Sequence, residues 1–115
     1  MEPSCLFCKI VAKQIPAQVV HEDEHVVVFR DIRAVAPTHV LVIPREHFAS
    51  LDDAKPEHAA LLGHVMLTAA KVARDLGIAE GGYRTVVNKG EHAGQTVFLL
   101  HVHVLGGREF VWPPG

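Results

Sequence analysis

The stretch TVFLLHVHVL, residues 96–105, decides the fold of this sequence. Alternate side chains of a β-strand point to opposite faces, so one face of the predicted strand is wholly apolar and must lie in the core. That face carries Phe98, Leu100, Val102 and Val104. The opposite face carries His101 and His103, about 6.5–7 Å apart along the strand. Leu99 occupies the matching position two residues before His101.

A long helix is predicted over residues 56–76, where apolar side chains recur at intervals of one, three and four. Pro56 suits the first helical turn, Glu57 complements the positive end of the helix dipole, and Gly77 is placed to end the helix. The apolar face consists of Leu61, Leu62, Val65, Met66, Ala69, Val72, Ala73 and Leu76.

A short helix and four more strands precede or follow this long helix. Residues 5–14, CLFCKIVAKQ, have the apolar spacing of a short helix, and Pro16 disfavours its continuation. Residues 19–31, VVHEDEHVVVFRD, indicate two strands around a polar turn. Residues 39–44 and 81–90 give the third and fourth strands.

These elements predict one α+β domain over residues 1–115. We expect a mainly antiparallel sheet of about five strands, with one long and one short helix. A sheet with a single long helix has a face or an edge that needs cover, so we expect a homodimer.

The composition excludes several classes of partner. The chain has 115 residues, 49% of them apolar and 21% charged, with a net charge of −2. It has no basic surplus that would indicate nucleic acid, no apolar run long enough for a membrane span and no signal-peptide core. We therefore expect a cytoplasmic protein that contacts neither nucleic acid nor membrane, and any phosphate must be bound locally.

Cys5 and Cys8, in CLFC, are the two cysteines of the chain. A disulfide between them would close too small a loop to stabilise much, so a reduced pair is the better interpretation. The pair is either half of a zinc site or two buried thiols that act as small hydrophobic groups.

The pair His101 and His103 has three interpretations. The two rings can bracket one tetrahedral centre, with one attacking while the other donates a proton or hydrogen bond to the departing atom. They can also be two metal ligands, or plain structural histidines. Upstream, the loop NKGEHAGQT, residues 88–96, is either an anion-binding nest of backbone N–H groups or an ordinary hairpin turn.

Taken together, these motifs resemble those of the histidine triad (HIT) family, in particular its Hint branch. The resemblance extends over nearly the whole chain. It rests on CLFCKIVAKQIPAQVVHEDEHVVVFRDI, APTHVLVIPREH, GQTVF and HVHVLGGREFVWPPG. It implies a homodimer that hydrolyses purine nucleoside phosphoramidates, or related nucleotidyl compounds, through a nucleotidyl-histidine intermediate. No cofactor is required for such a reaction.

The resemblance also implies roles for single residues. His101 matches the nucleophile, His103 the histidine that contacts phosphate and leaving group, and His39 a further histidine of the proton network. Asp31 matches the carboxylate that accepts from the ribose hydroxyls. The residues that match the phosphate-binding positions are Asn88, Gly94, Gln95 and Thr96.

Other matches concern the base and the dimer. Four apolar side chains resemble the purine slot, although from the sequence alone they are plain core residues. They are Phe7, Ile10, Phe29 and Ile32. Trp112 resembles a residue that packs the dimer and shapes the leaving-group site. His21, His25, His58 and His64 are expected to be solvated, and His92 lies in the phosphate loop.

Leu99 departs from the family pattern, which has histidine there. The nucleophile needs an acceptor for its second ring nitrogen, and in the family this is the main-chain carbonyl at this position, which leucine retains. The departure does affect metal binding, because Cys5, Cys8 and His47 match three zinc ligands and Leu99 replaces the fourth. We therefore expect zinc to be absent or weakly bound.

Two rival functions remain open from the sequence. One is a nucleotide-binding scaffold whose hydrolysis is incidental. The other is a dinucleoside polyphosphate hydrolase, a reaction of another HIT branch, against which the tail GGREFVWPPG argues.

Overall fold

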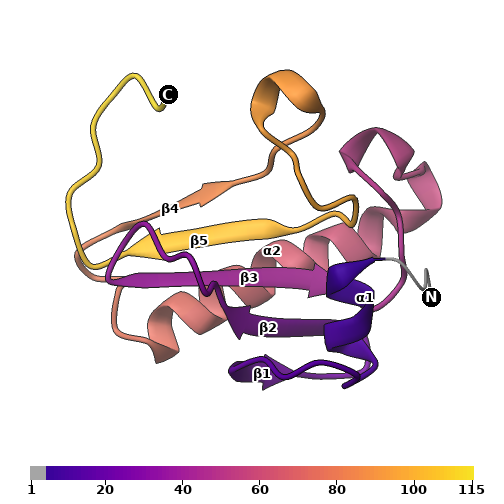
Figure 1. The fold of residues 1–115 in the computed structure, drawn as a ribbon. Helices are drawn as coiled ribbons and strands as arrows, with labels where there is room; N and C mark the ends of the chain where they lie inside the picture. The colour runs from indigo at the N-terminus through magenta and orange to yellow at the C-terminus, as the bar shows by residue number, and fades with distance from the viewer. Residues whose placement is uncertain (1–4) are drawn as a thin grey trace.

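A computed structural model describes residues 5–115 of the chain (Figure 1). Its five strands form one sheet in the order β1-β2-β3-β5-β4, and every neighbouring pair is antiparallel. The strands are β1 (Val19–Glu22), β2 (Val26–Arg30), β3 (Thr38–Pro44), β4 (Tyr83–Val86) and β5 (Val102–Gly106). The helices are α1 (Leu6–Val11) and α2 (Ala59–Asp75). The predicted α+β architecture is confirmed.

The long helix α2 covers one face of the sheet, behind the strands in Figure 1. Its first predicted turn is a 3-10 turn, Pro56–His58, and Gly77 ends it with a φ of 78°. Val65, Ala69 and Val72 of α2 are buried against side chains from the three central strands. Val102 and Val104 of β5 belong to this core, as the alternation of apolar residues predicted.

The short helix α1 covers the opposite face and lies in front of the sheet in Figure 1. A second apolar cluster forms under it from Cys5, Phe7, Cys8, Val27, Phe29, Leu41, Ile43 and Leu99. The sheet therefore separates two cores, and the side of β5 that carries His103 faces the second one.

The prediction of one long final strand over residues 96–105 is wrong in its first half. β5 begins only at Val102, because the backbone before it is hydrogen-bonded elsewhere. The N–H of Leu100 donates to the carbonyl of Phe48 at 2.8 Å, outside the ladder that pairs β5 with β3. Phe98, predicted to be core, is 59% exposed.

The turn between β1 and β2 is built around Asp23. One of its carboxylate oxygens accepts from the backbone N–H groups of His25 and Val26, at 2.8 and 2.9 Å. The other lies 3.2 Å from Nε2 of His21 and 2.9 Å from Nε2 of His64 on α2. Asp23 therefore connects the hairpin to the long helix.

Besides His21, two further histidines expected to be solvated have structural contacts that the sequence did not indicate. His64 reaches Asp23, and His58 packs on the Phe48 ring at a centroid distance of 4.9 Å. His58 Nε2 also lies 2.8 Å from a carboxylate oxygen of Glu46. Within residues 5–115, no helix has both the length and the apolar character needed to cross a membrane.

Candidate active site

Three histidines gather on the sheet face opposite α2. His39 belongs to β3, His103 to the adjacent strand β5, and His101 lies directly before β5. In the antiparallel register Leu41 faces His103 and His39 faces Leu105, which makes His39 and His103 diagonal neighbours. Their rings lie 5.2 Å apart, and those of His101 and His103 lie 5.0 Å apart, measured between centroids.

The ring of His101 is held by a carbonyl and by an aromatic edge. Its Nδ1 lies 2.7 Å from the carbonyl oxygen of Leu99, and the Phe7 ring packs against it at a centroid distance of 4.9 Å. Because a carbonyl only accepts, Nδ1 carries the hydrogen and Nε2 of the neutral ring carries a lone pair. The expected contact with the backbone of Leu99 is therefore present, and it gives the ring the tautomer of a nucleophile.

His39 holds His103 in the complementary state. The backbone N–H of Val35 donates to Nδ1 of His39 at 3.1 Å, so the hydrogen of the neutral ring is on Nε2. That Nε2 lies 3.0 Å from Nδ1 of His103 and 3.4 Å from a carboxylate oxygen of Asp31. His103 accepts at Nδ1, which leaves its own hydrogen on Nε2. One ring thus offers a lone pair and the neighbouring ring an N–H.

Burial keeps these rings neutral. It lowers the pKa of His101 below the ordinary 6.5, against opposing effects of the Leu99 carbonyl and Asp31. Burial, with the neighbouring His101 and His39, lowers the pKa of His103 to about 4. Burial likewise lowers the pKa of His39, although Asp31 opposes this. A neutral imidazole near pH 7 is the form that attacks phosphorus.

The loop 88–96 is ordered by its own hydrogen bonds. Gly90 and Gly94 have φ angles of 86° and 82°, which favour glycine, and a 3-10 turn, Glu91–Ala93, lies between them. The N–H groups of Gly94 and Gln95 donate to the carbonyls of Glu91 and Gly90. The predicted donation of these N–H groups to a phosphate therefore requires them to share or release these bonds.

The side chain of Gln95 also orders this loop, a role that could not be predicted from the sequence. Its amide nitrogen donates to the carbonyl of Ala49 at 2.6 Å, and its amide oxygen accepts from the N–H of Gly90 at 3.0 Å. Of the other predicted phosphate ligands, Asn88 is half-buried and Thr96 exposed. His92 is also exposed.

The four residues predicted to form the purine slot do not all lie in one cluster. Phe7 and Phe29 are buried in edge-to-face contact at 5.4 Å, and Ile10 packs against their cluster. Ile32 is 95% exposed. Trp112 is also exposed, in the C-terminal tail.

The three predicted zinc ligands do meet. The donor atoms of Cys5, Cys8 and His47 lie within 4.8 Å of one another, and Nδ1 of His47 is 3.0 Å from the sulfur of Cys8. Thiolate and imidazole are the donors that zinc prefers. Leu99 is fully buried in the same cluster as both cysteines, so the chain supplies three protein donors that fit zinc and an alkyl group at the fourth family position.

Asp31, His39 and His103 form a second group of metal-ligand type, also with donor atoms within 4.8 Å. Their nitrogen and oxygen atoms face one another at hydrogen-bonding distances. This arrangement favours a network that shares protons.

Comparisons with known proteins show which family this chain belongs to. A model of the HIT domain matches residues 12–110. An uncharacterized HIT-like protein of Synechococcus elongatus is 50% identical over 115 residues, which is 100% of both chains. The crystal structure of a HIT family hydrolase from Legionella pneumophila Philadelphia 1 is 47% identical, with a TM-score of 0.95, and the match covers 97% of this chain and 100% of that one.

A zinc-bound histidine triad family protein from Mycobacterium smegmatis is 39% identical, with a TM-score of 0.77, over 91% of this chain and 76% of that one. The fold, the histidine cluster and these matches define a histidine triad protein. This chain belongs to the HIT family.

Proposed function

We propose that this protein hydrolyses nucleotidyl compounds, with purine nucleoside phosphoramidates as substrates, in the manner of the Hint branch. The observation that carries the proposal is the pair of complementary tautomers. A lone pair on Nε2 of His101 stands beside an N–H on Nε2 of His103, because Leu99 and His39 occupy the two Nδ1 atoms.

In the first step, Nε2 of His101 forms a bond to the α-phosphorus, and the bond from phosphorus to the leaving nitrogen breaks. The nitrogen departs with the electron pair of that bond and one proton. An anionic substrate raises the pKa values of nearby imidazoles, so in the reactive complex the group of Asp31, His39 and His103 holds one additional proton. His103 delivers that proton, and the product is a neutral amine.

In the second step, water attacks the phosphorus of the nucleotidyl-histidine. The bond between phosphorus and Nε2 breaks, its electron pair returns to His101, and the proton of the water returns to His103. The products are a nucleoside monophosphate and the starting enzyme. The hydrogen bond from Nδ1 to the Leu99 carbonyl favours the imidazolium of the intermediate.

The nucleotide would lie along the same face of the sheet. The carboxylate of Asp31 retains lone pairs for the ribose hydroxyls, beside its contact with His39. Asn88 and the loop that contains Gly94, Gln95 and Thr96 supply polar groups for the phosphate. Phe7, Ile10, Phe29 and Ile32 would contact the purine, with Ile32 covering the base from the exposed side.

The test is a substrate panel on the intact chain. Adenosine and guanosine phosphoramidates, an aminoacyl adenylate and a dinucleoside polyphosphate are compared with His101→Ala and with His25→Ala, an exposed histidine outside the site. We expect phosphoramidates to be cleaved fastest, and His101→Ala to lose at least about a thousandfold while nucleotide binding is retained. Full activity of His101→Ala, or no turnover of any substrate, would overturn the proposal.

Zinc binding to Cys5, Cys8 and His47 is a separate proposal, of a weak site. The three donors fit the ion, and zinc would tie α1 to the segment after β3, a structural role outside the reaction. Because Leu99 contributes no donor, we expect affinity below that of a four-ligand site.

The proposed homodimer would use α2 and the outer edge of β4. Met66 and Leu67 are exposed on the side of α2 away from the sheet, and Tyr83 and Val87 are exposed along β4. β4 lies at the end of the sheet, so its outer backbone groups can pair with another strand. Exposed Val111 and Trp112 in the tail are further apolar surface for a second copy.

A further inference from the structure

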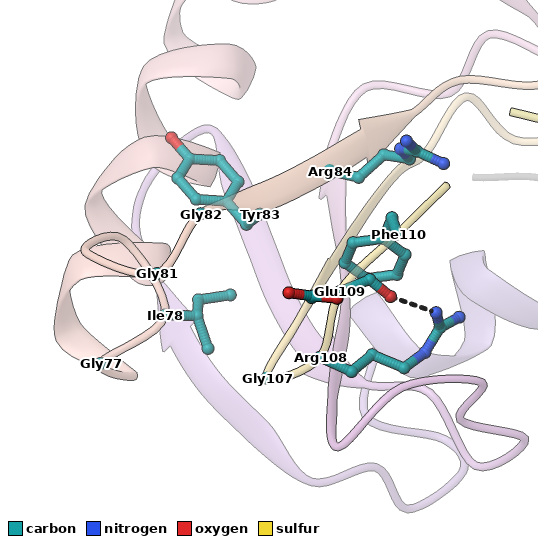
Figure 2. Close-up of a pocket in the computed structure, with 10 residues that line it drawn as sticks. All are labelled: Gly77, Ile78, Gly81, Gly82, Tyr83, Arg84, Gly107, Arg108, Glu109 and Phe110. Carbon is teal, nitrogen blue, oxygen red and sulfur yellow. Dashed lines mark hydrogen bonds between the residues drawn. The ribbon is translucent and has the colours of Figure 1, made fainter. Parts of the chain in front are cut away.

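A hollow lies at the far end of β5, next to the turn that follows α2 (Figure 2). It has a volume of about 690 Å³, and its lining includes Arg84 and Arg108. Both guanidinium groups stack on the Phe110 ring, at 5.2 Å for Arg84 and 4.3 Å for Arg108. Figure 2 shows the hydrogen bond that Nη1 of Arg108 donates to the backbone carbonyl of Glu109 in the tail.

Arg108 also reaches the loop between β2 and β3, which leads into His39. Its Nε and Nη2 donate to the carbonyl of Val35, at 3.2 and 3.1 Å. The N–H of the same Val35 donates to Nδ1 of His39, whose Nε2 meets His103. Hydrogen bonds at the two backbone groups of Val35 thus connect the guanidinium to His39 and, through His39, to His103.

The loop before β3 depends on this anchor. The side chain of Val35 is 63% exposed, so packing does not fix the residue. Gly107 brings the tail close to the loop, because a Cβ at Gly107 would lie 2.9 Å from Pro37. A φ of 89° also favours glycine there. This close approach allows Nε and Nη2 of Arg108 to donate together to the carbonyl of Val35.

We propose that Arg108 is a positioning residue for the proposed hydrolysis. By fixing the carbonyl of Val35 it fixes the backbone around that residue, and the Val35 N–H then keeps Nδ1 of His39 as an acceptor. His39 in turn presents Nε2–H to His103, which presents its own N–H to the leaving group. The inference rests on the proposed function, and it assigns to Arg108 the control of the tautomers of His39 and of the proton donor His103.

Arg84 provides a matched control. It stacks on the same Phe110 ring and lines the same hollow, but its Nη2 donates to the carbonyl of Val111, at 2.9 Å. If Arg108 served only to anchor the tail, Arg84→Gln and Arg108→Gln would have similar effects. If Arg108 acts through Val35, only Arg108→Gln changes the histidines.

The first measurement needs no substrate. Nitrogen NMR of the imidazoles reports the tautomers of His39 and His103 in the wild type, Arg108→Gln, Arg108→Lys and Arg84→Gln. We expect wild-type His39 with its hydrogen on Nε2, a mixture of tautomers in Arg108→Gln, partial restoration in Arg108→Lys and no change in Arg84→Gln. An unchanged His39 tautomer in folded Arg108→Gln overturns the proposal.

The second measurement is turnover of a phosphoramidate. We expect Arg108→Gln to lower kcat about tenfold with little change in KM, a fraction of the roughly 100- to 10,000-fold that acid–base catalysis contributes. Arg84→Gln should stay within about twofold. Equal losses in the two variants overturn the proposal. If the tautomers shift as expected but the wild type hydrolyses no substrate, the proposed function fails. The effect of Arg108 on the tautomers of His39 and His103 would still be established.

Discussion

At the scale of single residues, the histidines of the candidate site have defined hydrogen-bond partners. The neutral rings of His101 and His103 are fixed in opposite tautomers by one carbonyl and one histidine. The spacing of the two histidines, and the resemblance, indicated which residues these would be. The Val35 contact to His39 could not be predicted from the sequence, because it uses a backbone N–H that every residue except proline carries.

The first prediction concerns pH. Burial lowers the pKa values of His101, His103 and His39 below 6.5, so each of the three rings is mostly neutral at that pH. We expect kcat/KM for a phosphoramidate, corrected for spontaneous hydrolysis, to rise from pH 7.5 to 6.5, because the reactive complex holds one proton more than the free enzyme. It should decline only at lower pH, where His101 becomes protonated. A decline centred at or above pH 6.5 would contradict the lowered pKa values.

The second prediction concerns Leu99→His. The carbonyl that orients His101 belongs to the backbone, so turnover should change by less than about tenfold, or about 1.4 kcal/mol. The new imidazole would complete a four-ligand set with Cys5, Cys8 and His47, and zinc affinity should rise at least about tenfold. Turnover and chelator competition measure the two effects, with Leu99→Ile as the control. A hundredfold gain in turnover would show that the side chain matters to the chemistry.

At the scale of elements, alternation predicted β5 correctly only where a neighbouring strand enforces it. Val102 and Val104 face α2 because both pair with β3 in the ladder, and Val104 also pairs with β4. Phe98 lies outside that ladder and is exposed, although it fits the same pattern. The pattern of apolar residues cannot show that the carbonyl of Phe48 takes the N–H of Leu100.

The third prediction concerns the turn around Asp23. Burial raises the pKa of Asp23, but hydrogen bonds from the His25 backbone, His64, the Val26 backbone and His21 more than offset this and hold it well below 3.8. A carboxylate whose pKa is lowered by folding stabilises the fold at pH values above its pKa in the unfolded chain. This contribution is lost as pH falls below about 3.8.

Asp23→Asn should therefore lower the free energy of unfolding at pH 7 by about 1–3 kcal/mol. It should also reduce the dependence of stability on pH in the acid range. Chemical denaturation at pH 7, 5 and 3 measures both effects. Glu24→Gln, at an exposed carboxylate one residue away, serves as the control, and equal pH slopes in wild type and Asp23→Asn would refute the prediction.

At the scale of the whole molecule, the sequence predicted one sheet with a long and a short helix, and the structure has both helices on opposite faces. The division of the apolar residues between two cores was harder to predict from the sequence. Cys5 and Cys8, for example, take part in the second core and are also candidate metal ligands. Burial alone does not distinguish the two roles.

The fourth prediction concerns assembly. Leu67 is 71% exposed on the outer side of α2, where the proposed dimer contact lies. Sedimentation should give the wild type a mass near twice 12.6 kDa, and Leu67→Glu should shift it toward a single chain, because a buried carboxylate at an apolar contact is costly. Leu51→Glu, at another exposed leucine, should leave the mass unchanged. A monomeric wild type would contradict the proposed homodimer.

The sheet also works as a partition. The three histidines of the candidate site lie on one side, whereas Val65, Ala69 and Val72 of α2 fill the other. Substitutions that fill or loosen the helix side can change the melting temperature without reaching the histidines, so the heat tolerance of this protein can be tuned almost independently of its chemistry. Sequence variants selected for growth temperature would then collect beneath α2, and variants selected for substrate would collect beneath α1.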